Sequence, residues 1–130
     1  MIQFHLDARS GVPTYLQLVQ QVRQAVRLGI LCPGDQLPTV KDVVSGLAIN
    51  PNTVLKAYRE LDREGLVEGR RGIGTFVSGT VPSTPPDGVK ELRVTLQRWI
   101  GRARAAGLDE DSMAALFADT VRPPAASRVA

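Results

Sequence analysis

Few residues in this chain could support catalysis or bind a metal ion. Cys32 is the only cysteine and His5 the only histidine, and they stand in separate N-terminal segments with no third residue to orient either side chain. One histidine and one cysteine cannot build a zinc cage, and a nucleophile needs a neighbouring base. Cys32 stands next to Pro33 in a predicted turn. A single cysteine in such a turn is more often an inert thiol than a redox or metal sensor. We expect no enzyme, no metal site and no cofactor.

Short polar side chains gather instead at one predicted helix start. The stretch "INPNTVLKAYRELDREGL" opens with Asn50 in a position that suits an N-cap and Pro51 in the first helical position. The N-terminal end of a helix fits the major groove of B-DNA, where asparagine pairs with adenine and threonine contacts phosphate or a thymine methyl. Asn50, Asn52 and Thr53 are therefore candidate DNA contacts. Capping alone explains Asn50 and Thr53 at most helix starts, so the interpretation depends on the surrounding elements.

Two adjacent arginines stand at the tip of a predicted β-hairpin. The segments "LVEGRR" and "GIGTFVS" are rich in β-branched and apolar residues and flank a glycine-rich basic tip. Arg70 and Arg71 can lie along the minor groove, while Gly72 and Gly74 permit a tight turn and a close approach of the backbone. An ordinary solvated hairpin is the alternative, and the preceding helices make it the less favoured one.

Hydrophobic periodicity predicts the elements that position these residues. Alternation at residues 2–6 predicts a short strand, and residues 13–28 repeat apolar side chains at helical spacing. The segment "CPGDQLP" is a turn-rich connector. A short helix capped by Thr39 ends near Ala48, and the next helix, stopped by Gly65, should bury Val54, Leu55, Tyr58 and Leu61. The order predicts a mainly α fold with a small β-hairpin, a winged helix-turn-helix.

The C-terminal part should be separate from this domain. We expect a DNA-binding domain at residues 1–78, a linker at 79–88 ("GTVPSTPPDG"), a helical hairpin at 89–121 and a disordered tail at 122–130. The hairpin is too small to be stable alone, so its apolar stripe should pack on a second copy. The expected dimer interface comprises Leu92, Leu96, Trp99, Ile100, Leu108, Met113, Leu116 and Phe117.

Composition excludes some functions and leaves others open. The 130 residues, 43% of them hydrophobic, suffice for one small core with an appendage. The sequence contains neither an apolar run long enough for a membrane span nor a secretory signal, so we expect a cytoplasmic protein without a membrane partner. The net charge of +3 is compatible with nucleic acid without requiring it.

The stretch "LPTVKDVVSGLAINPNTVLKAYRELDREGLVEGRRGIGTFV" resembles the DNA-binding domain of the GntR family of bacterial transcription regulators. The family pattern runs Leu-Pro-Ser, an Arg, Leu-Ala, Thr-Val, Glu-Gly-Leu and Gly-x-Gly-Thr-Phe-Val, and the match covers about residues 10–78. The segments "VPTYLQLVQQV" and "NPNTV" and the short tail resemble the YtrA-type subfamily. This resemblance implies a homodimeric repressor that binds a palindromic double-stranded DNA operator and controls its own operon and neighbouring transporter genes.

The resemblance also implies roles for particular residues. Thr39 and Lys41 stand where the family has a DNA-contacting Ser and Arg, although a lysine lacks the bidentate fork that reads guanine. Arg23 and Arg27 are weaker candidates for backbone contact. The expected DNA-binding set is Thr39, Lys41, Asn50, Pro51, Asn52, Thr53, Lys56, Tyr58, Arg70, Arg71, Gly72 and Gly74.

Two questions stay open at the level of sequence. A winged helix that binds DNA without sequence preference, as an architectural or interaction protein, is the alternative function. A small-molecule effector is the second question, because the C-terminal part is too short for a cavity of roughly several hundred Å³ unless a dimer interface forms one.

Overall fold

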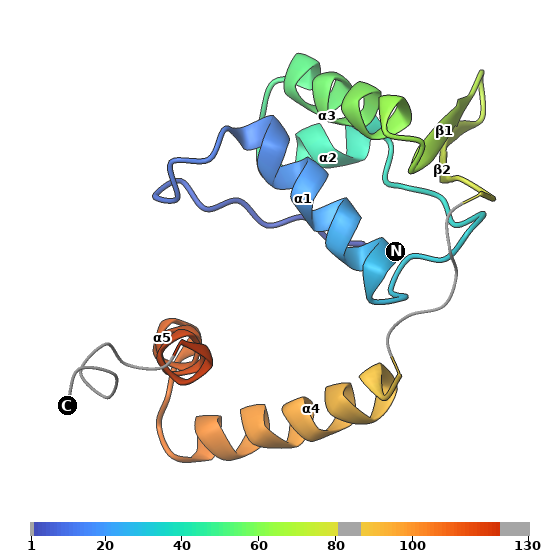
Figure 1. Ribbon diagram of the computed structural model, residues 1–130. Coiled ribbons are helices and arrows are strands. Elements are labelled where there is room, and N and C mark those ends of the chain that lie inside the picture. Colours follow the sequence, from blue (N-terminus) through green and yellow to red (C-terminus); the bar gives the residue numbers. More distant parts are fainter. Residues whose placement is uncertain (1, 81–86, 123–130) are drawn as a thin grey trace. The chain divides into compact units, whose positions relative to one another are not determined.

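The computed structural model describes residues 2–80 and 87–122, and the chain divides into two compact units with the boundary between Asp87 and Gly88 (Figure 1). Residues 81–86 of the predicted linker and 123–130 of the predicted tail lie outside the described residues. The elements are α1 (Thr14–Arg27), α2 (Val40–Leu47), α3 (Pro51–Arg63), β1 (Val67–Arg70), β2 (Gly74–Val77), α4 (Val89–Ala105) and α5 (Glu110–Val121). This order confirms the predicted fold class, a winged helix-turn-helix followed by two helices.

Helix α3 contacts three other elements of the first unit, namely α1, α2 and β1 (Figure 1). Its Val54 and Leu61 are fully buried together with Leu18 and Val22 of α1. Each such aliphatic side chain contributes about 1.5–3 kcal/mol when it is removed from water. Leu55, which we expected on this apolar face, is instead 36% exposed, because it lies one residue beyond the buried stripe. The core thus fixes the orientation of α3 and leaves its N-terminal end outside.

The turn between α2 and α3 contains a residue in an unusual conformation. Ala48 adopts φ 54° and ψ 45°, and it is the only non-glycine residue with positive φ within residues 2–80 and 87–122. Its N–H donates to the carbonyl of Val44 at 2.9 Å, which closes the last turn of α2. The left-handed turn redirects the chain so that α3 can begin at Pro51.

Strands β1 and β2 form an antiparallel hairpin in which Val67 pairs with Val77 and Arg70 with Gly74. The connector before α2, predicted only as a turn-rich segment, also pairs with β2. The Leu37 N–H donates to the Thr75 carbonyl, and the Val77 N–H donates to the Asp35 carbonyl, each bond 2.8 Å long. This third segment attaches the hairpin to the start of α2.

The predicted strand at residues 2–6 does not form. Ile2 and Phe4 are buried as the alternation predicted, but no strand among the described residues pairs with this segment. Glutamine side chains one turn apart on α1 instead bind the backbone of this segment and of the residue just beyond it. Gln21 accepts from the His5 N–H at 2.9 Å, and the buried Gln17 accepts from the Asp7 N–H at 2.8 Å.

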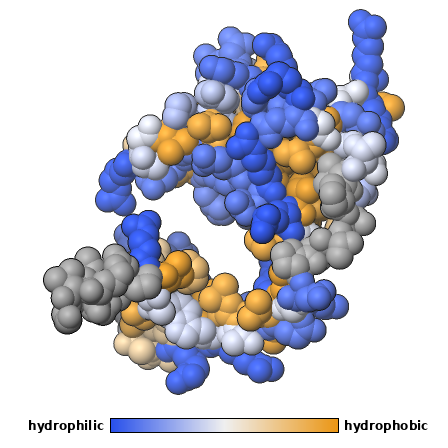
Figure 2. Space-filling view, viewed as in Figure 1, coloured by the Kyte–Doolittle hydropathy of each residue, from blue (hydrophilic) through white to orange (hydrophobic). Residues whose placement is uncertain are grey.

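Helices α4 and α5 form the second unit. Ala103 and Met113 are its only buried residues among those described, so Met113, which we expected in a dimer interface, belongs to the small core of the unit itself. Asp109 caps α5 by accepting from the Ser112 N–H at 2.8 Å, and this hydrogen bond lowers the pKa of the Asp109 carboxyl. Large apolar residues remain exposed on the surface of the unit (Figure 2), namely Leu92, Val94, Leu96, Leu116, Phe117 and Val121.

None of the helices in the described ranges combines the length and the apolarity that a bilayer crossing requires.

Candidate nucleic-acid interface

The N-terminal end of α3 presents two asparagines with different tasks. Asn50 is the N-cap, and its side-chain oxygen accepts from the Asn52 N–H at 2.8 Å. The side chain of Asn52 is exposed and makes no hydrogen bond to any residue that the structure describes. Helix capping therefore accounts for Asn50 but not for Asn52, whose amide is free to donate to and accept from a ligand.

The start of α2 lies close in sequence and is capped independently. The Thr39 hydroxyl accepts from the Asp42 N–H at 3.1 Å, and the Asp42 carboxylate accepts from the Thr39 N–H at 3.4 Å. This reciprocal pair is a capping box, which satisfies two N–H groups at the helix end. The neighbouring Lys41 is exposed. Its ammonium group carries the positive charge of this helix end.

Side chains from α1 and α3 together line an open hollow of 370 Å³ at the start of both helices. The lining residues are Thr14 and Tyr15 of α1, the N-cap Asn50, and Asn52, Thr53 and Lys56 of α3. The Lys56 ammonium lies 4.1 Å from the centroid of the Tyr15 ring. Neither Thr14 nor Tyr15 was in the DNA-binding set expected from the sequence. Tyr15 was interpreted there only as one apolar position of the helical repeat in residues 13–28.

The two arginines of the hairpin tip differ in their surroundings. The Arg70 guanidinium stacks on the Phe76 ring, 4.4 Å from its centroid, and bonds to the Glu68 carboxylate at 3.1 Å. Arg71 is exposed and forms no ion pair with any described residue. Arg70 therefore helps to organise the hairpin, and the charge of Arg71 faces solvent.

Glycine is required at two positions of the tip. Gly72 has a φ of +74°, which L side chains rarely adopt. Gly74 has a φ of +147°, and a Cβ there would lie 2.6 Å from the Gln36 side-chain nitrogen. Ile73 between them is 66% exposed. The backbone of the tip can therefore approach another surface closely.

Tyr58 was expected on the buried face of α3 with its hydroxyl near phosphate, and the structure agrees with the burial but directs the hydroxyl elsewhere. Its side chain is buried, and its hydroxyl donates to the Pro38 carbonyl at 2.6 Å. Burial, and to a smaller extent the charge of Asp42, raises the pKa of the Tyr58 phenol. Tyr58 therefore connects α3 to the segment before α2 and leaves the set of candidate DNA contacts.

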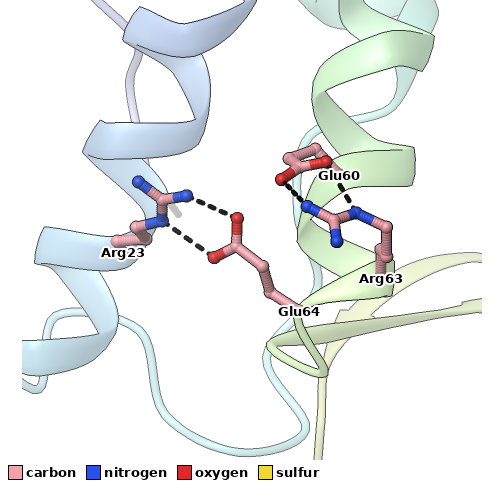
Figure 3. Close-up of polar contacts among 4 residues, drawn as sticks. All are labelled: Arg23, Glu60, Arg63 and Glu64. Carbon is pink, nitrogen blue, oxygen red and sulfur yellow. Dashed lines mark hydrogen bonds and ion pairs between the residues drawn. The ribbon is translucent and has the colours of Figure 1, made fainter.

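Arg23, a weaker candidate for backbone contact, is also occupied. Its guanidinium donates to both carboxylate oxygens of Glu64, the residue that follows α3, and the bond from Nε is 2.8 Å long (Figure 3). In the same view Arg63 pairs with Glu60, which lowers the pKa of the Glu60 carboxyl. The Arg23–Glu64 pair joins α1 to the C-terminal end of α3, away from the free end that carries Asn52.

The chain is similar to known bacterial regulatory proteins. Residues 14–77 match the family model "Bacterial regulatory proteins, gntR family". The HTH-type transcriptional repressor YtrA of Bacillus subtilis (strain 168) is 40% identical over 114 residues, which cover 87% of this chain and 86% of that protein.

Two solved structures share the fold. YtrA from Sulfolobus acidocaldarius, a GntR-family transcription factor, is 31% identical with a TM-score of 0.56 and covers 75% of this chain and 97% of its own. The DNA-binding domain of AraR in complex with operator ORX1 is 26% identical with a TM-score of 0.50 and covers 60% of this chain and 93% of its own. The chain therefore belongs to the gntR family of bacterial regulatory proteins and is a DNA-binding transcriptional regulator, not an enzyme.

Proposed function

We propose that the protein is a sequence-specific repressor that binds, as a homodimer, to a two-fold symmetric operator. The observation that carries this proposal is the free side-chain amide of Asn52 at the exposed start of α3. A helix that enters the major groove presents its N-terminal residues to the base edges, and an asparagine amide pairs in a bidentate manner with adenine. A protein that bound DNA only through charge would not need such a group at this position.

Base reading and phosphate binding fall to different residues in this proposal. Asn52 reads a base, Thr53 and Pro51 approach the groove beside it, and Asn50 and Thr39 hold the two helix starts in place. Phosphates are bound by the exposed cations Lys41, Lys56 and Arg71. The tip of the wing, with Gly72 and Gly74, lies against the adjacent groove. Binding should weaken steeply as salt rises, because each phosphate contact releases counterions.

The α4–α5 unit is the proposed dimerisation element. Its apolar surface includes Leu92, Leu96, Leu116 and Phe117, which are between 45% and 66% exposed, together with the half-buried Trp99, Ile100 and Leu108. Monomeric proteins rarely leave a contiguous apolar surface of this kind uncovered. Charge favours the same partner, since α4 is basic and the segment that follows it is acidic. The residues concerned are Lys90, Arg93, Arg98, Arg102 and Arg104 against Asp109, Glu110, Asp111 and Asp119.

A substitution in this surface tests the dimer. Leu96→Asp would place a carboxylate in the proposed interface, where an unpaired charge is strongly unfavourable. We expect sedimentation of this variant to give a monomer, while the exposed substitution Gln97→Asp leaves the dimer intact. A dimer that survives Leu96→Asp would remove α4 from the interface.

The name of the B. subtilis relative supports repression as the regulatory outcome. We propose that the protein acts in the cytoplasm on its own operon and on neighbouring transporter genes. Pairing of two identical subunits places two α3 helices about one helical turn of DNA apart, so the operator should be an inverted repeat.

The test is a binding titration with the DNA just upstream of the gene, beside a scrambled duplex of equal length at the same salt concentration. Strong preference for the upstream fragment, with a footprint of two symmetric half-sites, would support a local repressor. Equal affinity for both duplexes, and for fragments selected from the whole genome, would support the alternative of a winged helix that binds DNA without sequence preference.

A further inference from the structure

The hollow at the start of α3 contains an aromatic side chain to which the proposed function gives no role. Tyr15 belongs to α1, yet it lines the same hollow as Asn52, Thr53 and Lys56 of α3. Its ring is only half-buried, and no hydrogen bond of its hydroxyl to a described residue is present. Packing against the core therefore accounts for one part of this side chain, and the other part faces the hollow.

The contact that Tyr15 makes there is with a cation. The Lys56 ammonium lies 4.1 Å from the centroid of the Tyr15 ring, well within the range of a cation–π interaction. Lys56 is exposed and forms no ion pair with the part of the chain that the structure describes. A free lysine on a helix surface samples many rotamers, and fixing one of them before a ligand arrives reduces the entropy lost on binding.

We infer that Tyr15 is a positioning residue for DNA binding, whose ring holds the Lys56 ammonium at the mouth of the hollow, where it contacts a backbone phosphate. This inference rests on the proposed function. An aromatic face can direct an ammonium group without neutralising it, whereas a carboxylate partner in the same place would compete with phosphate. Thr14 and Thr53 line the same hollow, and their hydroxyl groups would complete a site for an oxyanion.

The arrangement makes α1 a part of the interface. Helices α1 and α3 pack on each other, so the distance between Tyr15 and Lys56 is set by the core and not by a flexible loop. A phosphate bound by Lys56 would then fix the register of α3 along the groove, which is the role that backbone contacts have in positioning base-reading residues.

A double-mutant cycle tests the inference with the full chain and two duplexes, the fragment upstream of the gene and a scrambled one. Tyr15→Leu keeps an apolar side chain but removes the ring, and Tyr15→Phe keeps the ring but removes the hydroxyl. We expect Tyr15→Leu to weaken binding of both duplexes about two- to fivefold, the range of an exposed cation–π interaction. Tyr15→Phe should bind as the wild type does.

The partner residue decides whether the effect passes through the ammonium group. Lys56→Gln should reduce the slope of log affinity against log salt by about 0.9. Adding Tyr15→Leu to Lys56→Gln should cause no further loss, whereas adding it to Lys41→Gln should cause the full loss. An additive effect of Tyr15→Leu on Lys56→Gln would overturn the inference, and so would a loss in Tyr15→Phe, because the hydroxyl would then contact DNA directly.

A measurement without DNA separates this inference from the proposed function. The ring current of Tyr15 should shift the side-chain protons of Lys56 upfield in NMR spectra of the free protein, and the shift should disappear in Tyr15→Leu and persist in Tyr15→Phe. A wild-type protein without this shift would refute the positioning role. A protein that binds neither duplex would refute the proposed function, and the NMR result would still decide whether the ring holds the ammonium.

Discussion

The C-terminal end of α2 allows a sharp test of the structure, because glycine should be favoured over alanine at position 48 and alanine over glycine at position 46. Ala48 has φ 54° and ψ 45°, and this left-handed conformation is unfavourable for a residue with a Cβ by about 1–2 kcal/mol. Glycine adopts it freely, but its unfolded chain has more entropy to lose, by about 0.5–1 kcal/mol. Ala48→Gly should therefore raise the free energy of unfolding by about 0.5–1 kcal/mol.

Gly46, two residues earlier, provides the matched comparison. It lies in the last turn of α2, it is exposed, and a Cβ placed on it would have no atom within 4 Å. Alanine is a better helix former than glycine, so Gly46→Ala should also stabilise the protein, by about 0.5–1 kcal/mol. Both substitutions should therefore stabilise the protein, although one replaces alanine by glycine and the other replaces glycine by alanine.

Hydrogen exchange at Leu61 is the assay, because this fully buried residue of α3 reports on the first unit alone. Each substitution should slow exchange at the Leu61 amide about two- to fivefold if exchange requires unfolding of the unit. DNA affinity should be unchanged in both variants, since the backbone path of the turn is kept. Faster or unaltered exchange in Ala48→Gly, beside the expected slowing in Gly46→Ala, would refute the left-handed conformation at position 48.

Three further predictions concern the polar contacts of the first unit. Gln17→Ala should lower the free energy of unfolding, measured by urea denaturation, by about 2 kcal/mol, because the side-chain amide of Gln17 makes four hydrogen bonds to residues 7–12. Gln20→Ala, at an exposed position of the same helix, should have little effect. Arg71→Ala should reduce the slope of log affinity against log salt by about one unit. Arg70→Ala should reduce it by less, because the Arg70 guanidinium already stacks on Phe76 and pairs with Glu68. Equal slopes for the two variants would contradict these different roles. Pairing with Arg63 lowers the pKa of the Glu60 carboxyl, so this pairing stabilises the fold at pH values above the ordinary glutamate pKa of about 4.3. The stabilisation is lost as the pH falls through the lowered pKa. A Glu60→Gln variant should therefore differ from the wild type in stability near neutral pH and approach it at acid pH.

Local sequence signals predicted most of the first unit. Thr39 and Asn50 are N-caps as their residue types indicated, Pro51 occupies the first turn of α3, and the glycine-rich basic segment forms the tip of the hairpin. These features depend on residues close to one another in the chain, where capping and turn preferences act directly.

The sequence-based predictions that were wrong or incomplete concern contacts between segments that are distant in sequence. Residues 2–6 have the alternation of a strand, but in place of a neighbouring strand Gln21 of α1 binds the backbone of His5, and Gln17 binds that of Asp7, just beyond the segment. Tyr58 is buried as the apolar face predicted, but its hydroxyl, expected near phosphate, donates to the carbonyl of Pro38, twenty residues away. Hydrophobic periodicity also could not predict the contact between Tyr15 of α1 and Lys56 of α3, because that contact arises only when the two helices pack.

The central claim is that the exposed amide of Asn52 reads a base in the operator. The most direct test is the ratio of affinities for the preferred duplex and its scrambled counterpart, measured at one salt concentration for the wild type and for Asn52→Ala. A bidentate contact contributes roughly 1–3 kcal/mol of discrimination, so the ratio should fall roughly 5- to 150-fold while affinity for the scrambled duplex stays constant. An unchanged ratio, or an equal loss of affinity on both duplexes, would show that Asn52 does not read sequence and would contradict the account.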